Sequence, residues 1–313
     1  MTYVAEEIAS QPQCWAAAAS LAKSITYSAL PLPGERVAVV GCGTSYNMAL
    51  AYARLREGAG QGTTDAMPAS ELYPRREYDR FLFLSRSGTT TEVLEALHQV
   101  PVWVPKCAIT ADGNSALAKE VALPVVLDFA SEQSIVQTRF ATSLLVLLRA
   151  YMGEEVGPLI EDAKRAVDAP LPAGALSANR FTFLGQDWAI GLAQEAALKL
   201  REAAQVSTEA YPALELRHGP ISILDAESVV WSLSAPPPGL AGDVAATRAM
   251  FVVPQFDPLA ELTRAQRLAV ELACARHLDP DHPRHLSFSV MLGSASGPVP
   301  GSASSSGDGG PTH

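Results

Sequence analysis

The sequence lacks several features that mark particular classes of protein. It has no uninterrupted apolar run of about 18 residues, the length that a membrane-spanning helix needs. Its acidic start, residues 1–7, has no charged segment followed by an apolar one, the pattern of a secretory signal. It also has no block of Lys or Arg residues that would form a nucleic-acid-binding surface. We therefore expect a cytoplasmic protein that binds neither membranes nor nucleic acids.

Cysteine is scarce as well. The 4 cysteines, at positions 14, 42, 107 and 274, are scattered without the close pairs typical of metal sites. We interpret them as reduced thiols of a cytosolic protein, and a structural disulfide is the less favoured alternative.

What the sequence does contain is ample material for a folded core. Hydrophobic residues make up 48% and charged residues 18% of the 313 residues. At roughly 150 residues per domain, this length indicates about two domains. The net charge is −10, so an anionic ligand would have to be held by local donors against the field of the whole molecule.

Short apolar runs alternate with helical patterns along the first half. We predict strands at 37–40, 81–84, 106–110 and 123–127, helices after the first two, and a long apolar helix at 135–151. Strands that are buried on both faces and alternate with helices predict an α/β fold with a parallel sheet.

The pattern then restarts, which indicates an internal duplication. Residues 181–185 repeat the short, largely apolar run that ends in a glycine at 37–41, and residues 229–234 match 81–85. We expect an N-terminal helical segment 1–24, a first domain 25–151, a linker 152–178, a second domain 179–292 and a disordered tail 293–313.

Two turns of the first half carry candidate anion ligands. Gly43, Thr44 and Ser45 follow the strand at 37–40, where a backbone can approach a ligand at the start of a helix. A dinucleotide fingerprint would need a further glycine where Tyr46 stands, so that alternative is disfavoured. One of the two hydroxyl residues could simply cap the helix.

The second turn is denser in hydroxyl groups. It contains the residues Ser85, Arg86, Ser87, Gly88, Thr89, Thr90 and Thr91. Hydroxyls and N–H groups at a helix start can surround a phosphate dianion. A capping box between Thr89 and Glu92 is compatible with that interpretation. The corresponding turn of the second half, 235–239, contains three prolines, which lack N–H donors. We therefore predict a single phosphate site, in the first half.

A helix of the second half carries candidate acid–base residues. Steps of four and three place Glu195, Lys199 and Glu202 on one helix face. Such spacing alone usually marks a solvated face, but the alanine-rich surroundings favour a partly buried cleft. His218 precedes a Gly-Pro turn and could move a proton at neutral pH, although a histidine in a loop is usually unremarkable.

At these motifs the chain resembles the sugar isomerase (SIS) family, and in particular the isomerase region of glutamine–fructose-6-phosphate aminotransferase. The motifs are residues 42–46, 85–90, 195–202, 215–220 and 279–286. The resemblance implies two tandem doubly wound parallel-sheet domains, each a three-layer αβα unit, that bind a hexose or hexosamine 6-phosphate.

The resemblance also implies residue roles. Ser45, Ser85, Ser87 and Thr90 match phosphate ligands, and Glu202 matches the base that moves a proton between C1 and C2 of the sugar through a cis-enediol. Lys199 matches a lysine of the site. None of these roles needs a metal ion or an organic cofactor, so neither is expected. His218 matches the residue that assists ring opening and comes from the partner subunit of a homodimer.

Three departures from the family pattern matter. The chain has no glutaminase domain, so glutamine-dependent amination is not expected of it alone. Arg86 stands where the synthases have glutamine, and Phe288 replaces a lysine of the family's closing segment. We expect an aldose–ketose isomerase or an aminosugar-phosphate deaminase. The alternative, favoured by Phe288, is a non-catalytic phosphosugar-binding protein.

Overall fold

The computed structural model describes residues 2–73 and 76–292. The predicted tail, 293–313, lies outside these residues. The strands are β1 (Val37–Gly41), β2 (Thr64–Pro68), β3 (Arg80–Leu84), β4 (Lys106–Thr110), β5 (Val125–Val126), β6 (Arg180–Gly185), β7 (Ser207–Pro212), β8 (Ser228–Ser232) and β9 (Met250–Val252). The helices are α1 (Tyr3–Ala9), α2 (Gln11–Ala22), α3 (Thr44–Gly58), α4 (Thr91–Gln99), α5 (Ala116–Glu120), α6 (Arg139–Tyr151), α7 (Gly157–Ala166), α8 (Ala189–Ala204), α9 (Leu240–Ala246) and α10 (Pro258–Ala275).

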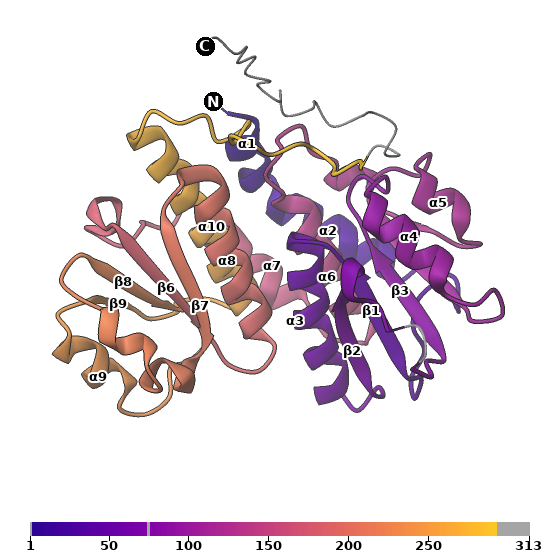
Figure 1. The fold of residues 1–313 in the computed structure, drawn as a ribbon, viewed down its shortest axis with the longest axis horizontal. Coiled ribbons are helices and arrows are strands. Elements are labelled where there is room, and N and C mark those ends of the chain that lie inside the picture. The colour runs from indigo at the N-terminus through magenta and orange to yellow at the C-terminus, as the bar shows by residue number, and fades with distance from the viewer. Residues whose placement is uncertain (1, 74–75, 293–313) are drawn as a thin grey trace, which may run out of the picture.

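The strands form two parallel sheets, which lie side by side with α3 and α8 between them (Figure 1). The first sheet has the order β2-β1-β3-β4-β5 and the second has the order β7-β6-β8-β9. The two orders correspond strand by strand, apart from the additional β5. The prediction of two tandem doubly wound parallel-sheet domains is therefore confirmed.

Each sheet is covered by helices on both faces. In the first domain, Ala38, Val40 and Phe83 pack against α4 and α5, whereas Val37 and Val39 face the side of α3 and α6. Alternate residues of one strand thus serve two helical layers. In the second domain α9 covers one face, and α8 and α10 cover the other. One continuous apolar cluster runs between the two sheets and joins the domains.

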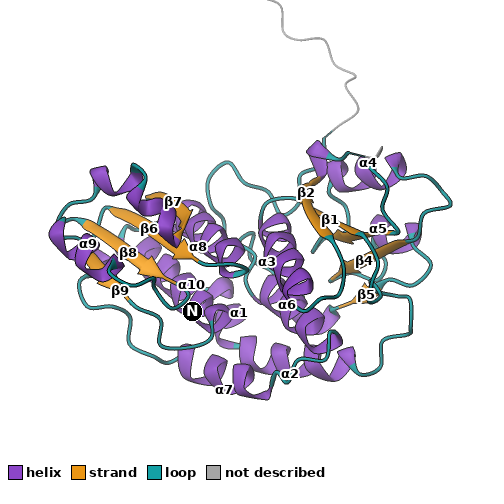
Figure 2. Cartoon of the chain, turned by 90° about the horizontal axis from the view of Figure 1, so that it is seen from below, coloured by secondary structure: helices purple, strands orange, loops and turns teal. Residues whose placement is uncertain are grey.

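The N-terminal segment consists of two helices that are part of this core. Trp15 of α2 is fully buried and donates from Nε1 to Thr142 Oγ1 of α6 at 2.9 Å. Gln11 donates to Gln266 of α10 at 2.8 Å. The predicted linker 152–178 contains α7, which packs beside α2 below the interdomain helices (Figure 2). Within the described part of the chain, no helix is long and apolar enough to cross a membrane.

Candidate functional site

The two hydroxyl-bearing turns lie next to each other. In the register of β1 and β3, Gly41 pairs with Leu84, so the turns that follow both strands leave the same edge of the sheet. Gly43, Thr44 and Ser45 come from the first turn, and Ser85 to Thr90 come from the second. The carboxyl edge of a doubly wound sheet is where such folds bind ligands.

The turn after β3 is held in shape by its own side chains. Ser85 Oγ accepts the N–H of Gly88 at 3.1 Å and lies 3.4 Å from Thr90 Oγ1. Gly88 has a φ of +62°, and a Cβ atom there would lie 2.2 Å from Ser115 Oγ, so only glycine fits. The N-cap residue of α4 is Thr90. Among the described residues, its side chain makes no capping hydrogen bond. The alternative capping box at Thr89 is therefore not formed.

Arg86 is directed into the protein. Its side chain is 2% exposed and pairs with Glu132 at 3.0 Å. The same guanidinium donates to the carbonyl groups of Ser134, Ile135 and Phe288 at 3.0–3.1 Å. Arg86 thus ties the turn to residues 132–135 through both terminal nitrogens of its guanidinium, whereas its buried Nε has no hydrogen-bond partner among the described residues.

The predicted acid–base residues of α8 come together at the junction of the two domains. Lys199 Nζ lies 3.3 Å from Glu195 Oε1 and 2.5 Å from Glu202 Oε2. Thr44 Oγ1 donates to Glu195 at 3.0 Å, and Asn47 Nδ2 donates to its other oxygen at 2.9 Å. The helix pair α3–α8 thereby connects the first turn to the candidate base.

Close packing of α3 and α8 makes these bonds reachable. A Cβ atom on Gly191 would lie 2.5 Å from the carbonyl oxygen of Asn47, so a larger residue would push the helices apart. Ala193, Ala196 and Ala197 are also buried. The expectation that the alanines of this helix allow close packing agrees with these contacts.

Burial and charge act against each other in this cluster. Glu195 and Lys199 are 0% and 1% exposed, whereas the side chain of Glu202 is 19% exposed. Burial raises the pKa of Glu195, and the charge of Glu202 adds to the rise. Burial lowers the pKa of Lys199, but the charges of Glu195 and Glu202 outweigh this effect and raise its pKa above the ordinary value. Of the three side chains, Glu202 is the one open to a ligand.

The chain returns across this site after α10, through residues 284–292, here called the closing segment. Arg284, His285 and Leu286 line a groove together with Glu202. Further along, Ser289 Oγ accepts hydrogen bonds from Ser87 Oγ at 3.1 Å and Thr89 Oγ1 at 3.0 Å. The closing segment therefore reaches from the candidate base to the hydroxyl-rich turn. The ribbon after α10 accordingly crosses from the second domain to the first (Figure 1).

Phe288 does not face the groove beside Glu202. Its ring covers the guanidinium of Arg86 at 3.9 Å, a cation–π contact. The residue that replaces the family's lysine therefore anchors the closing segment to Arg86.

Three acidic residues that sequence reasoning missed hold this arrangement. Asp281 accepts the N–H groups of Tyr3 and Val4 at 2.8 and 2.7 Å, at the start of α1. Glu7 of α1 accepts the N–H groups of Gln133 and Ser134 at 2.5 and 3.2 Å. Glu132 then holds Arg86. Asp281 lies in a motif singled out in the sequence, but no sequence signal connects Glu7 with Glu132.

His218 lies apart from the other candidates. It follows the 3₁₀-helix Ala213–Arg217 and is exposed. Among the described residues it makes no hydrogen bond or ion pair with Glu202 or Lys199. His218 follows β7, whose last residue Pro212 pairs with Gly185 just before α8 begins, whereas Glu202 lies near the end of α8. A single chain therefore does not bring His218 to the candidate base.

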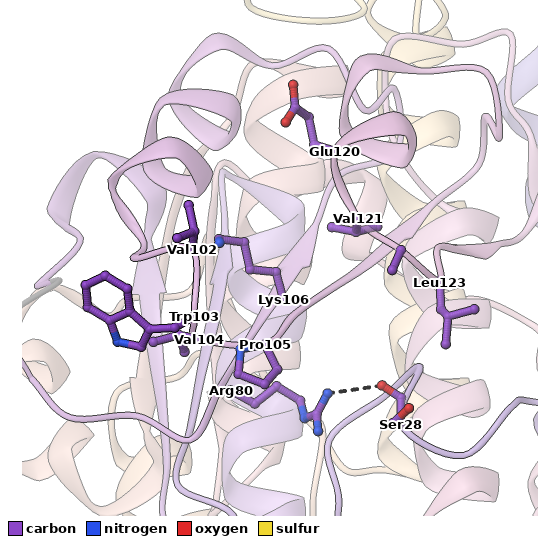
Figure 3. A pocket seen from close by; sticks show the side chains of 11 residues that line it. Ser28, Arg80, Val102, Trp103, Val104, Pro105, Lys106, Glu120, Val121 and Leu123 are labelled. Atoms are coloured by element: carbon purple, nitrogen blue, oxygen red, sulfur yellow. Dashed lines mark hydrogen bonds between the residues drawn. The ribbon is translucent and has the colours of Figure 1, made fainter.

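Another cavity of the first domain lies at the opposite edge of the sheet. Arg80 and Lys106, which begin β3 and β4, line it together with Trp103, which is 80% exposed (Figure 3). Arg80 is already paired with Glu35 at 2.7 Å and donates to Ser28 O at 3.0 Å. Within the described residues, no group of three or more His, Cys, Asp or Glu side chains is arranged to hold a metal ion.

Comparison with known proteins places this geometry in context. The chain is 29% identical over 305 residues to a glutamine–fructose-6-phosphate aminotransferase of Methanothermobacter thermautotrophicus, with 82% of this chain and 52% of that protein covered. The match covers most of this chain, and the chain spans about half the length of such curated relatives. No family model matches the chain.

Solved structures match over most of the chain. A glucosamine-6-phosphate deaminase from Thermotoga maritima superimposes with a TM-score of 0.79 and 27% identity, covering 93% of this chain and 100% of that one. The tagatose-6-phosphate ketose/aldose isomerase of Escherichia coli gives a TM-score of 0.71 at 20% identity, covering 91% and 97%. These comparisons confirm the resemblance to the sugar isomerase family, and within it to the isomerase region of the aminotransferases.

Proposed function

We propose that the protein acts on a hexose or hexosamine 6-phosphate as an aldose–ketose isomerase or an aminosugar-phosphate deaminase. The observation that carries this proposal is the cluster of Glu195, Lys199 and Glu202 beside two hydroxyl-rich turns. The similarity to a glucosamine-6-phosphate deaminase over nearly the whole chain supports the same class of substrate.

The phosphate would bind at the carboxyl edge of the first sheet. Ser45, Ser85, Ser87 and Thr90, with the backbone of Gly43 and Gly88 nearby, would surround its oxygens at the start of α4. Backbone N–H groups and the helix dipole favour a dianion there without a cationic cluster. Arg86 would support this turn by holding it against Glu132.

Glu202 would serve as the base at the C1–C2 edge of the open-chain sugar. It would take the proton from one carbon and return it to the neighbouring carbon through a cis-enediol, as the family resemblance implies. Lys199, 2.5 Å from Glu202, would fix the carboxylate in place. Glu195, held by Thr44 and Asn47, would in turn position Lys199.

Ring opening would require a second subunit. His218 lies away from Glu202 within one chain, so we propose a homodimer in which His218 of the partner subunit completes the site. This arrangement would be a symmetric C2 dimer with two shared sites.

The second candidate function is phosphosugar binding without chemistry. The contact of Phe288 with Arg86 favours it, because Phe288 cannot polarise a sugar oxygen. Loss of one such donor typically lowers the rate by about 10²–10³. The catalytic proposal therefore expects slow turnover.

The experiment is to incubate the protein with hexose and hexosamine 6-phosphates and to follow both the sugar product and ammonia. Glu202→Gln should abolish turnover and leave phosphosugar binding unchanged. A matched control is Glu161→Gln, because Glu161 pairs with Lys164 at the same i,i+3 spacing but is 66% exposed. Binding without turnover of any substrate would favour the second candidate, and turnover by Glu202→Gln at the parental rate would contradict the role of the base.

A further inference from the structure

Glu7 of α1 carries a buried carboxyl group that the proposed chemistry does not use. The residue is 3% exposed, and its Oε1 accepts the N–H groups of Gln133 and Ser134 at 2.5 and 3.2 Å. Its other oxygen, Oε2, is hydrogen-bonded to Ser134 Oγ. Among the described residues, all three hydrogen-bond partners of this carboxyl group are neutral.

The number of hydrogen atoms in the contact with Ser134 bears on the state of Glu7. A serine hydroxyl has one hydrogen to donate, and a carbonyl oxygen can only accept. Ser134 Oγ lies 2.8 Å from the carbonyl oxygen of Val136. If the hydroxyl hydrogen goes to Val136, the bond between Ser134 and Glu7 needs a hydrogen on Glu7 Oε2. An ionised Glu7 leaves one of the two buried bonds unmade, whereas a neutral Glu7 satisfies both.

The distribution of charge around Glu7 favours the same state. Glu132 is paired with Arg86 and accepts the N–H of Thr138 at 2.6 Å, so it is the ionised carboxylate of this cluster. Burial raises the pKa of Glu7, and the charge of Glu132 adds to the rise. One guanidinium therefore faces one carboxylate, and an ionised Glu7 would add a second negative charge without a cation.

The cations on the other elements around α1 are directed elsewhere. Arg139 of α6 donates to Ser10 Oγ and Ser131 O, and Arg267 of α10 donates to two carbonyl groups near the end of α7. The remaining titratable groups beside α1 are Cys14 of α2, Glu271 of α10 and Asp281, which accepts N–H groups at the start of α1. None of these groups supplies a positive charge to Glu7.

Residues 132–135 connect Glu7 with the hydroxyl-rich turn. Arg86 of the turn donates to the Glu132 carboxylate and to two carbonyl groups of this stretch, and Glu7 holds N–H groups of the same stretch. We propose that Glu7 is a positioning residue of the hydroxyl-rich turn, and that it supports residues 132–135 as a neutral carboxylic acid. An ionised Glu7 would place a further negative charge beside the support of a turn that takes a dianion. The consequence for ligand binding rests on the proposed function.

Two substitutions separate the neutral acid from a carboxylate. Glu7→Gln imitates the neutral acid, because its amide can accept both N–H groups and donate to Ser134 Oγ. Glu7→Ala removes all three bonds. In isothermal titration near pH 7, fructose 6-phosphate should bind to Glu7→Gln within about twofold of the parent and to Glu7→Ala about tenfold more weakly. The control Glu6→Ala changes the exposed neighbour on the same helix and should bind like the parent.

The proton on Glu7 can be measured without a ligand. Infrared difference spectra near pH 7 should show the carbonyl stretch of a protonated carboxyl group in the parent and in Glu6→Gln, but not in Glu7→Gln. In urea denaturation, the folding equilibrium constant of the parent relative to Glu7→Gln should fall as pH rises above about 5, by up to about tenfold per pH unit until Glu7 ionises in the folded state. The reason is that the folded parent keeps a proton that the unfolded chain has released.

The positioning role also has a readout without a ligand. The N–H of Gly88 donates to Ser85 Oγ at 3.1 Å within the turn. Its hydrogen exchange should be faster in Glu7→Ala than in the parent and unchanged in Glu7→Gln.

The outcomes keep this inference apart from the proposed function. Absence of the infrared band, together with a stability difference that does not change with pH, overturns the neutral acid. Parental exchange at Gly88 in Glu7→Ala overturns the positioning role. If Glu7→Ala does not fold, a Glu7→Gln variant with faster exchange at Gly88 than the parent overturns the inference by itself. A parent that binds no phosphosugar contradicts the proposed function, and the infrared and exchange measurements then still decide the role of Glu7.

Discussion

The turn after β3 and the turn after β8 occupy equivalent places in two sheets of the same topology, yet their chemistry differs. The first gathers hydroxyls around Gly88 before α4. The second is Ala235-Pro236-Pro237-Pro238-Gly239, and its Ser234 Oγ accepts the N–H of Gln186 at 3.0 Å. Three successive prolines remove the N–H donors that an anion needs. The two sheets therefore share a scaffold, and the chemistry of this turn distinguishes the proposed binding domain from its partner.

The largest expected effect comes from placing a negative charge in each turn. Ser87→Asp should weaken phosphosugar binding about a thousandfold, because like charges about 4 Å apart repel by roughly 4 kcal/mol at an effective dielectric constant of 20. Ser234→Asp, the matched change in the second turn, should leave affinity unchanged. Titration calorimetry with fructose 6-phosphate measures both. Equal affinity of Ser87→Asp and the parent would place the phosphate site elsewhere.

A second contrast sets the buried lysine of α8 against an exposed one. Lys199→Met leaves Glu195 buried beside Thr44 and Asn47 but without its cation, and should lower the free energy of unfolding by about 3 kcal/mol. Lys164→Met breaks an ion pair that is more than half exposed on both sides and should cost less than about 1 kcal/mol. Urea denaturation compares the two. Similar losses of unfolding free energy in the two variants would mean that Lys199 does not stabilise the buried Glu195.

The loss in Lys199→Met should depend on pH. Burial raises the pKa of Glu195, and removal of the lysine cation raises it further. The folded state then binds a proton at a pH where the unfolded chain has released it, so the stability of the variant falls as pH rises through that window. The difference from the parent should therefore be smaller near pH 5 than near pH 8. An equal difference at both values would contradict the direction given for Glu195.

The same contrast between regions explains what the sequence could predict. The central strands near 37–40, 81–84 and 106–110 were predicted correctly because strands buried on both faces form continuous apolar runs. The edge strands β2 and β7, with sequences TDAMP and STEAYP, were missed. Each is partly exposed and pairs on one side only, so neither apolar runs nor alternation mark it.

The candidate site was predictable to a similar degree. Spacing alone placed Glu195, Lys199 and Glu202 on one face, and the structure joins them through Lys199. The direction of Arg86 was not predictable, because it depends on Glu132, which is remote in sequence. Asn47 could have been found, since it lies three residues after Thr44 on the same helix face.

A further prediction tests whether two copies of the chain share a site. Glu202→Gln and His218→Ala should each be inactive alone, and mixing equal amounts of the unfolded chains before refolding should restore about a quarter of the parental activity. Half of the randomly formed dimers are hybrids, and each hybrid holds one intact site of two. Failure of complementation in protein that light scattering shows to be dimeric would contradict the shared site, and a monomer at micromolar concentration would contradict the dimer.

The smallest expected effect distinguishes two roles of the contacts at α1. One role is to stabilise the first domain, and the other is to position the closing segment, which reaches that domain from the second. Asp281→Asn and Thr2→Ala both weaken the start of α1, because Asp281 accepts from Tyr3 and Val4, and Thr2 accepts from Ala5 at 3.4 Å. Each should lower the free energy of unfolding by about 1 kcal/mol. Only Asp281 also fixes the chain just before the closing segment. Asp281→Asn alone should therefore loosen that segment over the groove beside Glu202 and weaken phosphosugar binding, by less than about threefold. Equal affinities in the two variants would mean that α1 stabilises the domain without positioning the closing segment.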